Sequence, residues 1–149
     1  MAYHLHDVYL HIKLERETKM KHKIPKQSAK LLEIVEFYLN SEAFKRLKPK
    51  TQSDYEKHLA ATVNSVVEGK TLGDYKNKNI KVRHLTDAYD QWVQTGIRNA
   101  NYRKTVLSAC WKHSMRYDVM IHNPVALVKT QKTDNRTVMW TREYVRRFL

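Results

Sequence analysis

The residues of this chain whose types could do chemistry include a group of histidines near its start. Four of them lie within the first 22 residues: His4, His6, His11 and His22. Histidines at alternate positions of a strand share a face and could approach a metal ion together. Only Asp7 supplements them, and no cysteine is near, which leaves too few ligands for a metal site. We therefore predict no metal and no cofactor, and expect these histidines at the surface.

Lysines and arginines form a second chemical feature, because 28 of them stand against 15 acidic residues and give a formal net charge of +13. Such a charge favours polyanion partners, nucleic acid first and an anionic membrane surface second. Two runs contain no acidic residue: Lys45, Arg46, Lys48 and Lys50, then Arg98, Arg103, Lys104, Lys112 and Arg116. The plain alternative for either run is a solvated helix face. Both runs flank predicted helices, which favours DNA binding.

The composition indicates a folded, mainly helical protein. Hydrophobic residues make up 42% of the chain, too many for a disordered basic tail, and three glycines with three prolines are too few for an all-β fold. Cys110 is the one cysteine, so a disulfide framework is excluded. No apolar run approaches the roughly 18 residues of a membrane span, and no signal sequence is evident. We expect a cytoplasmic, DNA-associated protein without a membrane partner.

Hydrophobic periodicity predicts a β appendage followed by helices. Alternating apolar residues at 8–14 and 19–24 predict a hairpin that Pro25 ends. Helical spacing predicts four longer helices, at 28–40, 51–69, 86–96 and 99–117. Ser28 is the expected N-cap of the first of these helices, and Gly96 the expected C′ residue of the third. Short helical turns are predicted before Pro49 and at 124–128.

The fourth long helix has the clearest inner face: Val106, Leu107, Cys110, Trp111 and Ser114. Between the second and third helices, residues 70–84 form a basic loop in which Leu72 and Ile80 are the expected buried anchors. A linker is predicted at 129–136, and a further helix begins after it. The predicted domain organisation is a basic β appendage at 1–27, a helical domain at 28–128, and a linker with the first helix of another domain at 129–149.

Three motifs, spaced along the predicted helices, resemble those of a known family. The predicted second helix opens with Lys48-Pro49-Lys50-Thr51-Gln52-Ser53-Asp54-Tyr55, a Lys-Pro-x-Thr-x-x-x-Tyr pattern. The fourth helix and the turn after it contain Asn101, Leu107, Trp111, Ser114, Met120 and Asn123-Pro124 at set spacing, and Trp140-Thr141-Arg142-Glu143 follows the linker. The chain from Ser28 to Val128 resembles the core-binding, SAM-like domain of tyrosine recombinases, the phage-integrase family. It departs from the family pattern at Asp118, where glycine is usual, at Ser114, where alanine is usual, and at Lys104, where an apolar residue is common.

The resemblance implies a mainly α fold, a SAM-like bundle of four to five helices with a short N-terminal β appendage. It also implies sequence-specific binding of double-stranded DNA at a core-type attachment site, in a bacterial or phage-infected cell, by a parent recombinase that assembles as a tetramer on DNA. In many relatives an N-terminal β appendage binds separate arm-type DNA sites, so residues 1–27 are a candidate remnant of one. The family's catalytic residues all belong to a domain beyond Leu149. This chain is therefore expected to bind DNA and not to cleave it.

The candidate DNA contacts combine the basic runs with the family's binding surfaces: Lys45, Arg46, Lys48, Lys50, Thr51, Arg98, Asn99, Asn101, Arg103, Lys104, Lys112, Lys129, Lys132 and Arg136. Backbone N–H groups and the positive dipole end at the start of the second helix favour phosphate, so its lysines are expected to position the domain. Arginine and asparagine pair with guanine and adenine edges, so the start of the fourth helix is the candidate for base recognition. Asn101 is equally expected to brace local backbone.

Other interpretations remain open from the sequence. His113 and Arg116 form a His-x-x-Arg pair like one in the family's catalytic domain, but they precede the linker, and a spacing of three puts both on one helix face. Tyr144 has no accompanying base, so no catalytic residue is predicted. The chain could instead be a stand-alone, non-catalytic DNA-binding regulator or an integrase remnant. A helical protein-interaction module, with charge serving solubility, is the second alternative.

Overall fold

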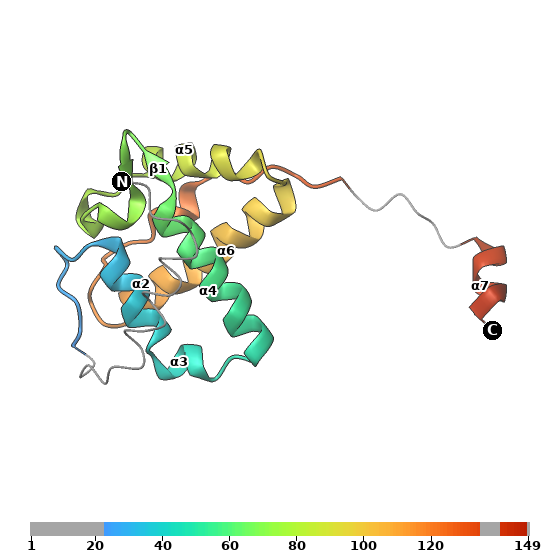
Figure 1. Ribbon diagram of the computed structural model, residues 1–149, viewed down its shortest axis with the longest axis horizontal. Helices are drawn as coiled ribbons and strands as arrows, with labels where there is room; N and C mark the ends of the chain where they lie inside the picture. Colours follow the sequence, from blue (N-terminus) through green and yellow to red (C-terminus); the bar gives the residue numbers. More distant parts are fainter. Residues whose placement is uncertain (1–22, 135–140, 149) are drawn as a thin grey trace.

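The computed structural model describes residues 23–134 and 141–148 and is mainly helical, as predicted (Figure 1). Its α-helices are α2 (Leu31–Leu39), α3 (Glu42–Lys45), α4 (Pro49–Asn64), α5 (Val82–Val93), α6 (Ile97–Met115) and α7 (Arg142–Phe148). A two-stranded sheet, β1 (Val66–Val67) and β2 (Lys70–Thr71), and three short 3-10 helices, η1 (Leu72–Asp74), η2 (Asn77–Asn79) and η3 (Pro124–Leu127), complete it. None of the described helices is both long enough and apolar enough to cross a bilayer.

The helix starts differ from those predicted, for local reasons. Helix α2 begins at Leu31 rather than near Ser28, because the Glu33 carboxylate accepts a hydrogen bond from the Lys30 backbone N–H (2.8 Å). Pro49 does not end the short helical turn before it but opens α4, where the absence of an N–H costs nothing. Gly96, with φ of +139°, is the N-cap of α6 and not the C′ residue of α5.

The predicted helix at 51–69 is wrong at its end, because α4 stops at Asn64 and a hairpin follows. Strands β1 and β2 pair antiparallel, with Val66 opposite Thr71. Glu68 and Gly69 between them both have positive φ, 51° and 75°. Two such residues form the tight turn whose twist matches a hairpin. Val66 and Val67 fit the apolar face of a helix and a strand equally well. The turn at Glu68 and Gly69 is what makes them a strand.

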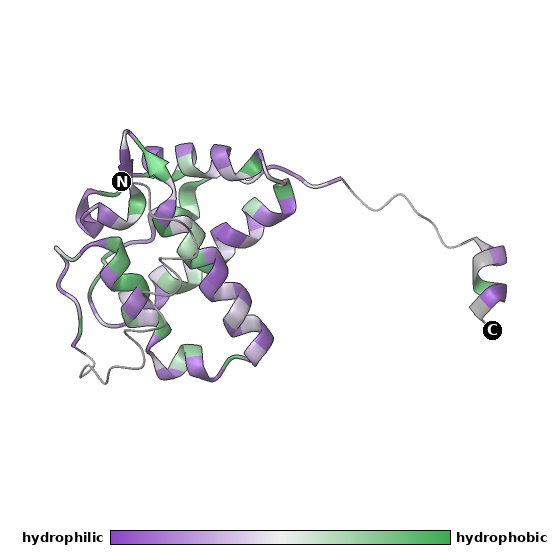
Figure 2. Ribbon diagram, viewed as in Figure 1, coloured by the Kyte–Doolittle hydropathy of each residue, from purple (hydrophilic) through white to green (hydrophobic). Residues whose placement is uncertain are grey.

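The core lies where α2, α4, α5 and α6 meet (Figure 1). Figure 2 shows hydrophobic and hydrophilic stretches alternating along α2 and α5, as expected for helices with one buried face. The five residues predicted for the inner face of α6 are all buried, and so are the two loop anchors Leu72 and Ile80. Trp111 of α6 and Tyr89 of α5 are the largest fully buried side chains of this core.

The C-terminal end of α6 closes at Asp118, whose φ is +57°. The Val119 N–H donates to the Ser114 carbonyl (3.1 Å), the six-residue bond of a left-handed helix stop, and the Val119 side chain is buried. Aspartate tolerates this conformation better than most residues, although glycine is the usual choice. The position at which the sequence departs from the family's glycine is therefore one where the backbone is left-handed.

Some predictions lie outside the described residues. These are the hairpin up to residue 22, the four histidines near the start of the chain, and Arg136 of the linker. Residues 23–26, which would include the end of the second predicted strand, have no regular secondary structure. Helix α7 confirms a helix after the linker. The division into a β appendage, a DNA-binding domain and a further domain stays a prediction.

A test of this packing concerns Gly73 in η1, which lies so close to α4 that an added Cβ would overlap the Val63 side chain. We expect Gly73→Ala to lower the free energy of unfolding by about 1–3 kcal/mol, because the core there has no room for a methyl group. Urea unfolding followed by circular dichroism measures it. Combining Gly73→Ala with Val63→Ala should cost less than the sum of the two single changes, and simple additivity would contradict the close contact.

Candidate nucleic-acid interface

The N-termini of α4 and α6 share features that suit phosphate binding. Neither N-cap residue, Lys48 or Gly96, supplies a side-chain hydrogen bond, and neither first turn contains an acidic residue. By contrast, the first turn of α2 contains Glu33, and the N-cap residue of α3 is Ser41, whose hydroxyl accepts from the Phe44 N–H. The first N–H groups of a helix have no acceptor within it and form the positive end of its dipole. Helices α4 and α6 therefore present N–H groups that an anion can occupy.

Exposed basic residues surround the start of α4: Lys45, Arg46, Lys48 and Lys50. The Gln52 side chain holds the turn before the helix, because its Nε2 donates to the carbonyls of Lys45 (3.0 Å) and Leu47 (2.7 Å). Lys45 forms an exposed ion pair with Glu42 (3.3 Å), whereas Thr51 is half-buried in the first turn. The turn thus fixes the backbone from which these side chains extend.

Arg98 and Asn99 are exposed in the first turn of α6, and Lys112 is exposed farther along it. Fourteen residues separate Arg98 from Lys112, close to four helical turns, so the two share one face. Arg116 follows on the same face and is exposed as well. This outer face of α6 is opposite the buried one and remains available for a polyanion.

Asn101 braces the protein, the second of its two predicted roles. The Tyr89 hydroxyl donates to Asn101 Oδ1 (2.5 Å), Asn101 Nδ2 donates to the Gln131 carbonyl (3.0 Å), and the Gln131 N–H donates to the Tyr89 hydroxyl (2.8 Å). We call these three residues the tyrosine triangle. Both polar groups of the Asn101 amide are used within it, so that side chain is not offered to a base edge.

Arg103 and Lys104 also differ from their predicted role of free cations at a base-recognition surface. The Arg103 guanidinium stacks over the Trp92 ring (5.3 Å), and its Nε donates to His58 Nδ1 (3.4 Å). Burial lowers the pKa of Arg103. Lys104 donates to the Val128 carbonyl at the end of η3. Both side chains are half-buried and join α6 to its neighbours. Among the candidates at the start of α6, Arg98 and Asn99 are the exposed ones.

Tyr102 is a surface aromatic residue that the sequence analysis did not place among the candidate contacts. It is 38% exposed, and its ring lies edge-on to His58 (4.9 Å) and Tyr55 (6.2 Å) of α4. It therefore lies where the first half of α6 packs against the middle of α4. An aromatic residue on the polar side of α6, between Asn101 and Arg103, was the signal in the sequence.

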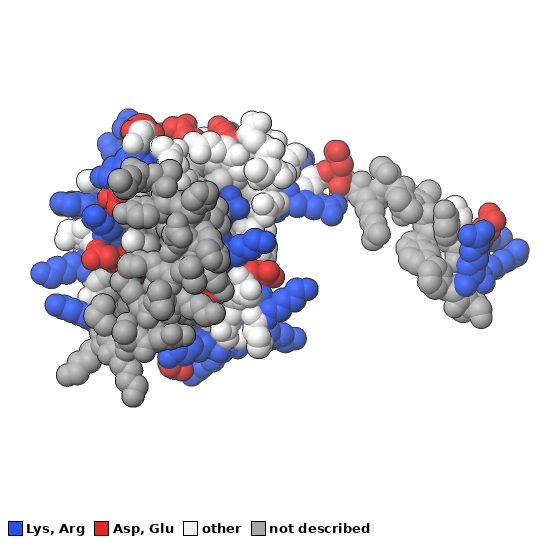
Figure 3. All heavy atoms as spheres, in the orientation of Figure 1, with Lys and Arg blue, Asp and Glu red and all other residues white. Residues whose placement is uncertain are grey.

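The segment after η3 carries two further candidates, Lys129 and Lys132, both exposed. The tyrosine triangle holds Gln131 between them against the start of α6. Figure 3 shows Lys and Arg side chains projecting at the edge of the molecule over α4 and over this segment. Asp and Glu side chains lie over α5, and others lie beside α4 and at the end of the segment. Most of the predicted basic candidates are thus exposed on the α4 and α6 side.

The described residues that resembled a catalytic pair, His113 and Arg116, differ in their surroundings. The His113 ring is buried against the rings of Phe37 (5.4 Å), Tyr38 (5.2 Å) and Tyr117 (5.0 Å), while Arg116 is exposed. The Cys110 thiol is fully buried, which raises its pKa. Within residues 23–134 and 141–148, no three His, Cys, Asp or Glu residues gather as metal ligands would.

Comparison with known proteins gives one structural likeness. No family model matches the chain, and no characterised protein matches it in sequence. Its structure is similar to a chain in the crystal structure of a lambda integrase tetramer bound to a Holliday junction, with a TM-score of 0.65 and 17% identity. The match covers 93% of this chain and 42% of that one, so the chain spans less than half of the integrase's length. The integrase-like helical fold is thereby shown.

The tyrosine triangle generates a prediction about the segment after η3. Tyr89→Phe removes the hydroxyl that both Asn101 and Gln131 use, and we expect it to lower the free energy of unfolding by about 1–3 kcal/mol. Trypsin should then cleave after Lys129 and Lys132 faster than in the unchanged protein. Tyr117→Phe is the control, because its hydroxyl is not part of the triangle. Equal cleavage rates in the two variants would show that the triangle does not hold the segment.

His58 generates a prediction about pH. Burial, and secondarily the nearby Arg103 charge, lower the pKa of His58 below its ordinary value of 6.5. The folded protein therefore binds this proton less readily than the unfolded chain, so stability is complete above about pH 6.5 and falls as the pH drops toward the folded pKa. We expect His58→Gln to flatten the loss of melting temperature between pH 7 and pH 5. An unchanged slope would mean that other groups cause it.

Proposed function

We propose that this chain is the core-binding, SAM-like part of a phage-type tyrosine recombinase and that it holds double-stranded DNA at a core-type attachment site. The observation that carries the proposal is the pair of uncapped helix N-termini, on α4 and α6, with exposed lysine and arginine residues beside each. Two positive helix ends whose helices cross at Tyr102 suit two phosphate contacts on one duplex.

The roles within this interface follow from side-chain chemistry. Lys48 and Lys50 are point charges beside free N–H groups, so they contact phosphate and set the register of the domain. Arg98 and Asn99 carry the planar donor groups that recognise guanine and adenine edges in a major groove, and they give the binding its sequence preference. The partly exposed Tyr102 ring, close to both groups of residues, contacts sugar or base. Lys112, Lys129 and Lys132 extend the contact along the backbone.

The structural likeness supports the same assignment, since the similar protein is a lambda integrase whose tetramer is bound to a Holliday junction. In our proposal the complete recombinase likewise assembles as a tetramer on DNA. Strand breakage and rejoining then belong to the part of the recombinase that carries the catalytic residues, and this chain contributes binding alone. A stand-alone DNA-binding regulator would use the same interface. No feature of the described part of the chain favours that alternative specifically.

Salt dependence of duplex binding tests the proposal. If about five phosphates are neutralised, a plot of log K against log salt should have a slope near −4.5. Fluorescence anisotropy with a labelled duplex measures it. Lys48→Ala/Lys50→Ala should reduce the magnitude of the slope by about 1.8, which corresponds to two lost phosphate contacts.

The matched control is Lys48→Arg/Lys50→Arg, which keeps both positive charges at the start of α4. It should leave the slope within error of the unchanged protein. Equal effects of the two double variants would contradict the assigned interface. A slope near zero for the unchanged protein would favour a protein-interaction module.

A further inference from the structure

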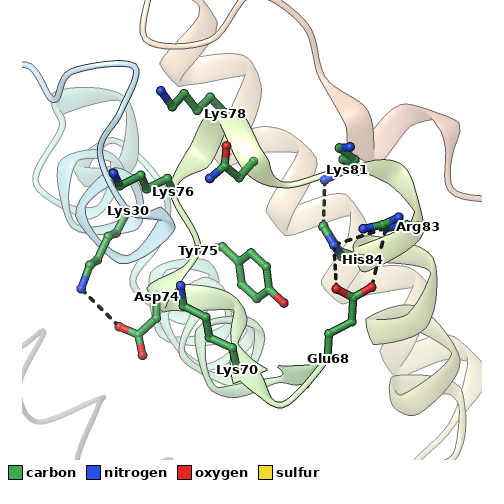
Figure 4. Close-up of a pocket in the computed structure, with 11 residues that line it drawn as sticks. Lys30, Glu68, Lys70, Asp74, Tyr75, Lys76, Lys78, Lys81, Arg83 and His84 are labelled. Carbon is green, nitrogen blue, oxygen red and sulfur yellow. Dashed lines mark hydrogen bonds and ion pairs between the residues drawn. The ribbon is translucent and has the colours of Figure 1, made fainter.

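A second basic surface lies away from α4's first turn, in a hollow of about 800 Å³ between the start of α2, the β1–β2 hairpin, η1, η2 and the start of α5 (Figure 4). Six lysine or arginine residues and two carboxylates line it. The cations are Lys30, Lys70, Lys76, Lys78, Lys81 and Arg83. We call this hollow the lysine pocket. The sequence showed only a basic loop here, with no indication that its charges converge.

Both carboxylates of the pocket are already neutralised. Asp74 pairs with Lys30 (3.6 Å), and Glu68 pairs with Arg83 (3.6 Å) and contacts the buried His84 ring (3.4 Å). Figure 4 shows these two groups on either side of Tyr75. They fix the rim of the pocket but leave its other cations without acidic partners.

Four ammonium groups remain: Lys70, Lys76, Lys78 and Lys81. Lys70 lies over the Tyr75 ring, 5.1 Å from its centroid, and the other three have no side-chain partner among the described residues. Like charges gathered around one hollow repel one another, and an anion placed between them relieves that repulsion. The lysine pocket therefore has the electrostatics of an anion site.

Hydrogen bonds fix the backbone of the segment that carries these lysines. The Leu31 N–H donates to the Tyr75 carbonyl (3.0 Å), and the Asn77 N–H donates to the Ala29 carbonyl (2.8 Å). The Tyr75 hydroxyl donates to the Val67 carbonyl (2.8 Å), so the ring is fixed against the hairpin. Such preorganisation reduces the entropy that a ligand must overcome on binding.

The chemistry of the pocket favours a phosphate chain over an enclosed small molecule. Small-molecule sites are mostly apolar and bury their ligand, whereas this hollow is open and charged. Its lysines are exposed and lie on three separate elements, β2, the η2 region and the residue before α5. Lysine binds phosphate as a point charge without requiring one geometry. Several lysines spread along an open hollow suit the successive phosphates of a nucleic-acid backbone.

The position of the pocket separates it from the interface proposed above. The pocket is at the C-terminal end of α4 and the N-terminal end of α5, whereas the interface is at the opposite ends of both helices (Figure 1). Sixteen residues of α4 correspond to about 24 Å, and twelve of α5 to about 18 Å. A major groove is only about 12 Å wide, so the two surfaces contact separate stretches of phosphate backbone.

We propose that the lysine pocket binds the phosphate backbone of a DNA segment other than the one held by the α4 and α6 interface. The inference rests on the proposed function, since it concerns a second segment of the same ligand. Each surface then accounts for its own set of phosphate contacts. The domain joins two DNA segments through opposite ends of α4.

Capture of a second duplex tests this. A biotinylated duplex on beads is saturated with protein and washed, and a labelled duplex is then added. We expect the unchanged protein to retain the label, and Lys76→Ala/Lys78→Ala/Lys81→Ala to reduce the retained label at least tenfold while protein remains on the beads. The matched variant Lys76→Arg/Lys78→Arg/Lys81→Arg keeps the charges and should retain the label. Full retention by the alanine variant would overturn the proposal.

Two further measurements separate this proposal from the first. Lys48→Ala/Lys50→Ala changes only the α4 and α6 interface. If the proposed function is wrong, this variant has the same salt slope as the unchanged protein, whatever the capture experiment shows for the lysine pocket. Tripolyphosphate is added as a competitor in the capture experiment and should release the label. If tripolyphosphate binds the unchanged protein but not the alanine variant, while both capture the second duplex equally, the pocket is a site for free phosphates and the backbone proposal is wrong.

Discussion

Burial of the inner face of α6 is the constraint on which the rest of the structure depends. Helices α2, α4 and α5 and the 3-10 helix η3 all pack against α6, and Val106, Leu107, Cys110 and Trp111 are almost completely buried there. Each large side chain buried there contributes roughly 1.5–3 kcal/mol. Because that face is fixed, its opposite face and its N-terminus point outward in a determined direction. The buried apolar residues thus fix the orientation of the helix, and with it the positions of its exposed basic side chains.

The distribution of charge follows from this arrangement. Three of the cations in the sequence runs are used inside the protein or at its edge, where Arg103 stacks on Trp92, Lys104 holds the end of η3 and Lys45 pairs with Glu42. Other cations are divided between the helix ends at the α4 and α6 interface and the lysine pocket. A net charge of +13 destabilises a compact state through self-repulsion, and separating the charges onto two surfaces limits that cost.

Features that depend on hydrophobic periodicity, such as the buried face of a helix, were predicted from the sequence. Features that depend on contacts between distant residues were not. The five residues predicted for the inner face of α6 are all buried, because a 3.6-residue period leaves one choice of buried face. Ala100 and His113 of the same helix are buried as well. The end of α4 was wrong, because the valines at 63, 66 and 67 fit a helix and a strand equally. The bonds that hold Asn101 and Lys104 could not be predicted, for another reason. Their partners, Gln131 and Val128, are 30 and 24 residues away, and no local pattern reveals such bonds.

The tyrosine triangle has a consequence for whatever follows it in the chain. Gln131 is held beside the start of α6, and eleven residues later the chain reaches Arg142, where α7 begins. Eleven residues extend at most about 36–40 Å, whatever their conformation. Helix α7 is thus confined to a sphere of that radius centred on the edge of the α4 and α6 interface. A tether of this length corresponds to an effective concentration of roughly millimolar. Contact between α7 and a ligand bound to α6 is therefore an intramolecular step.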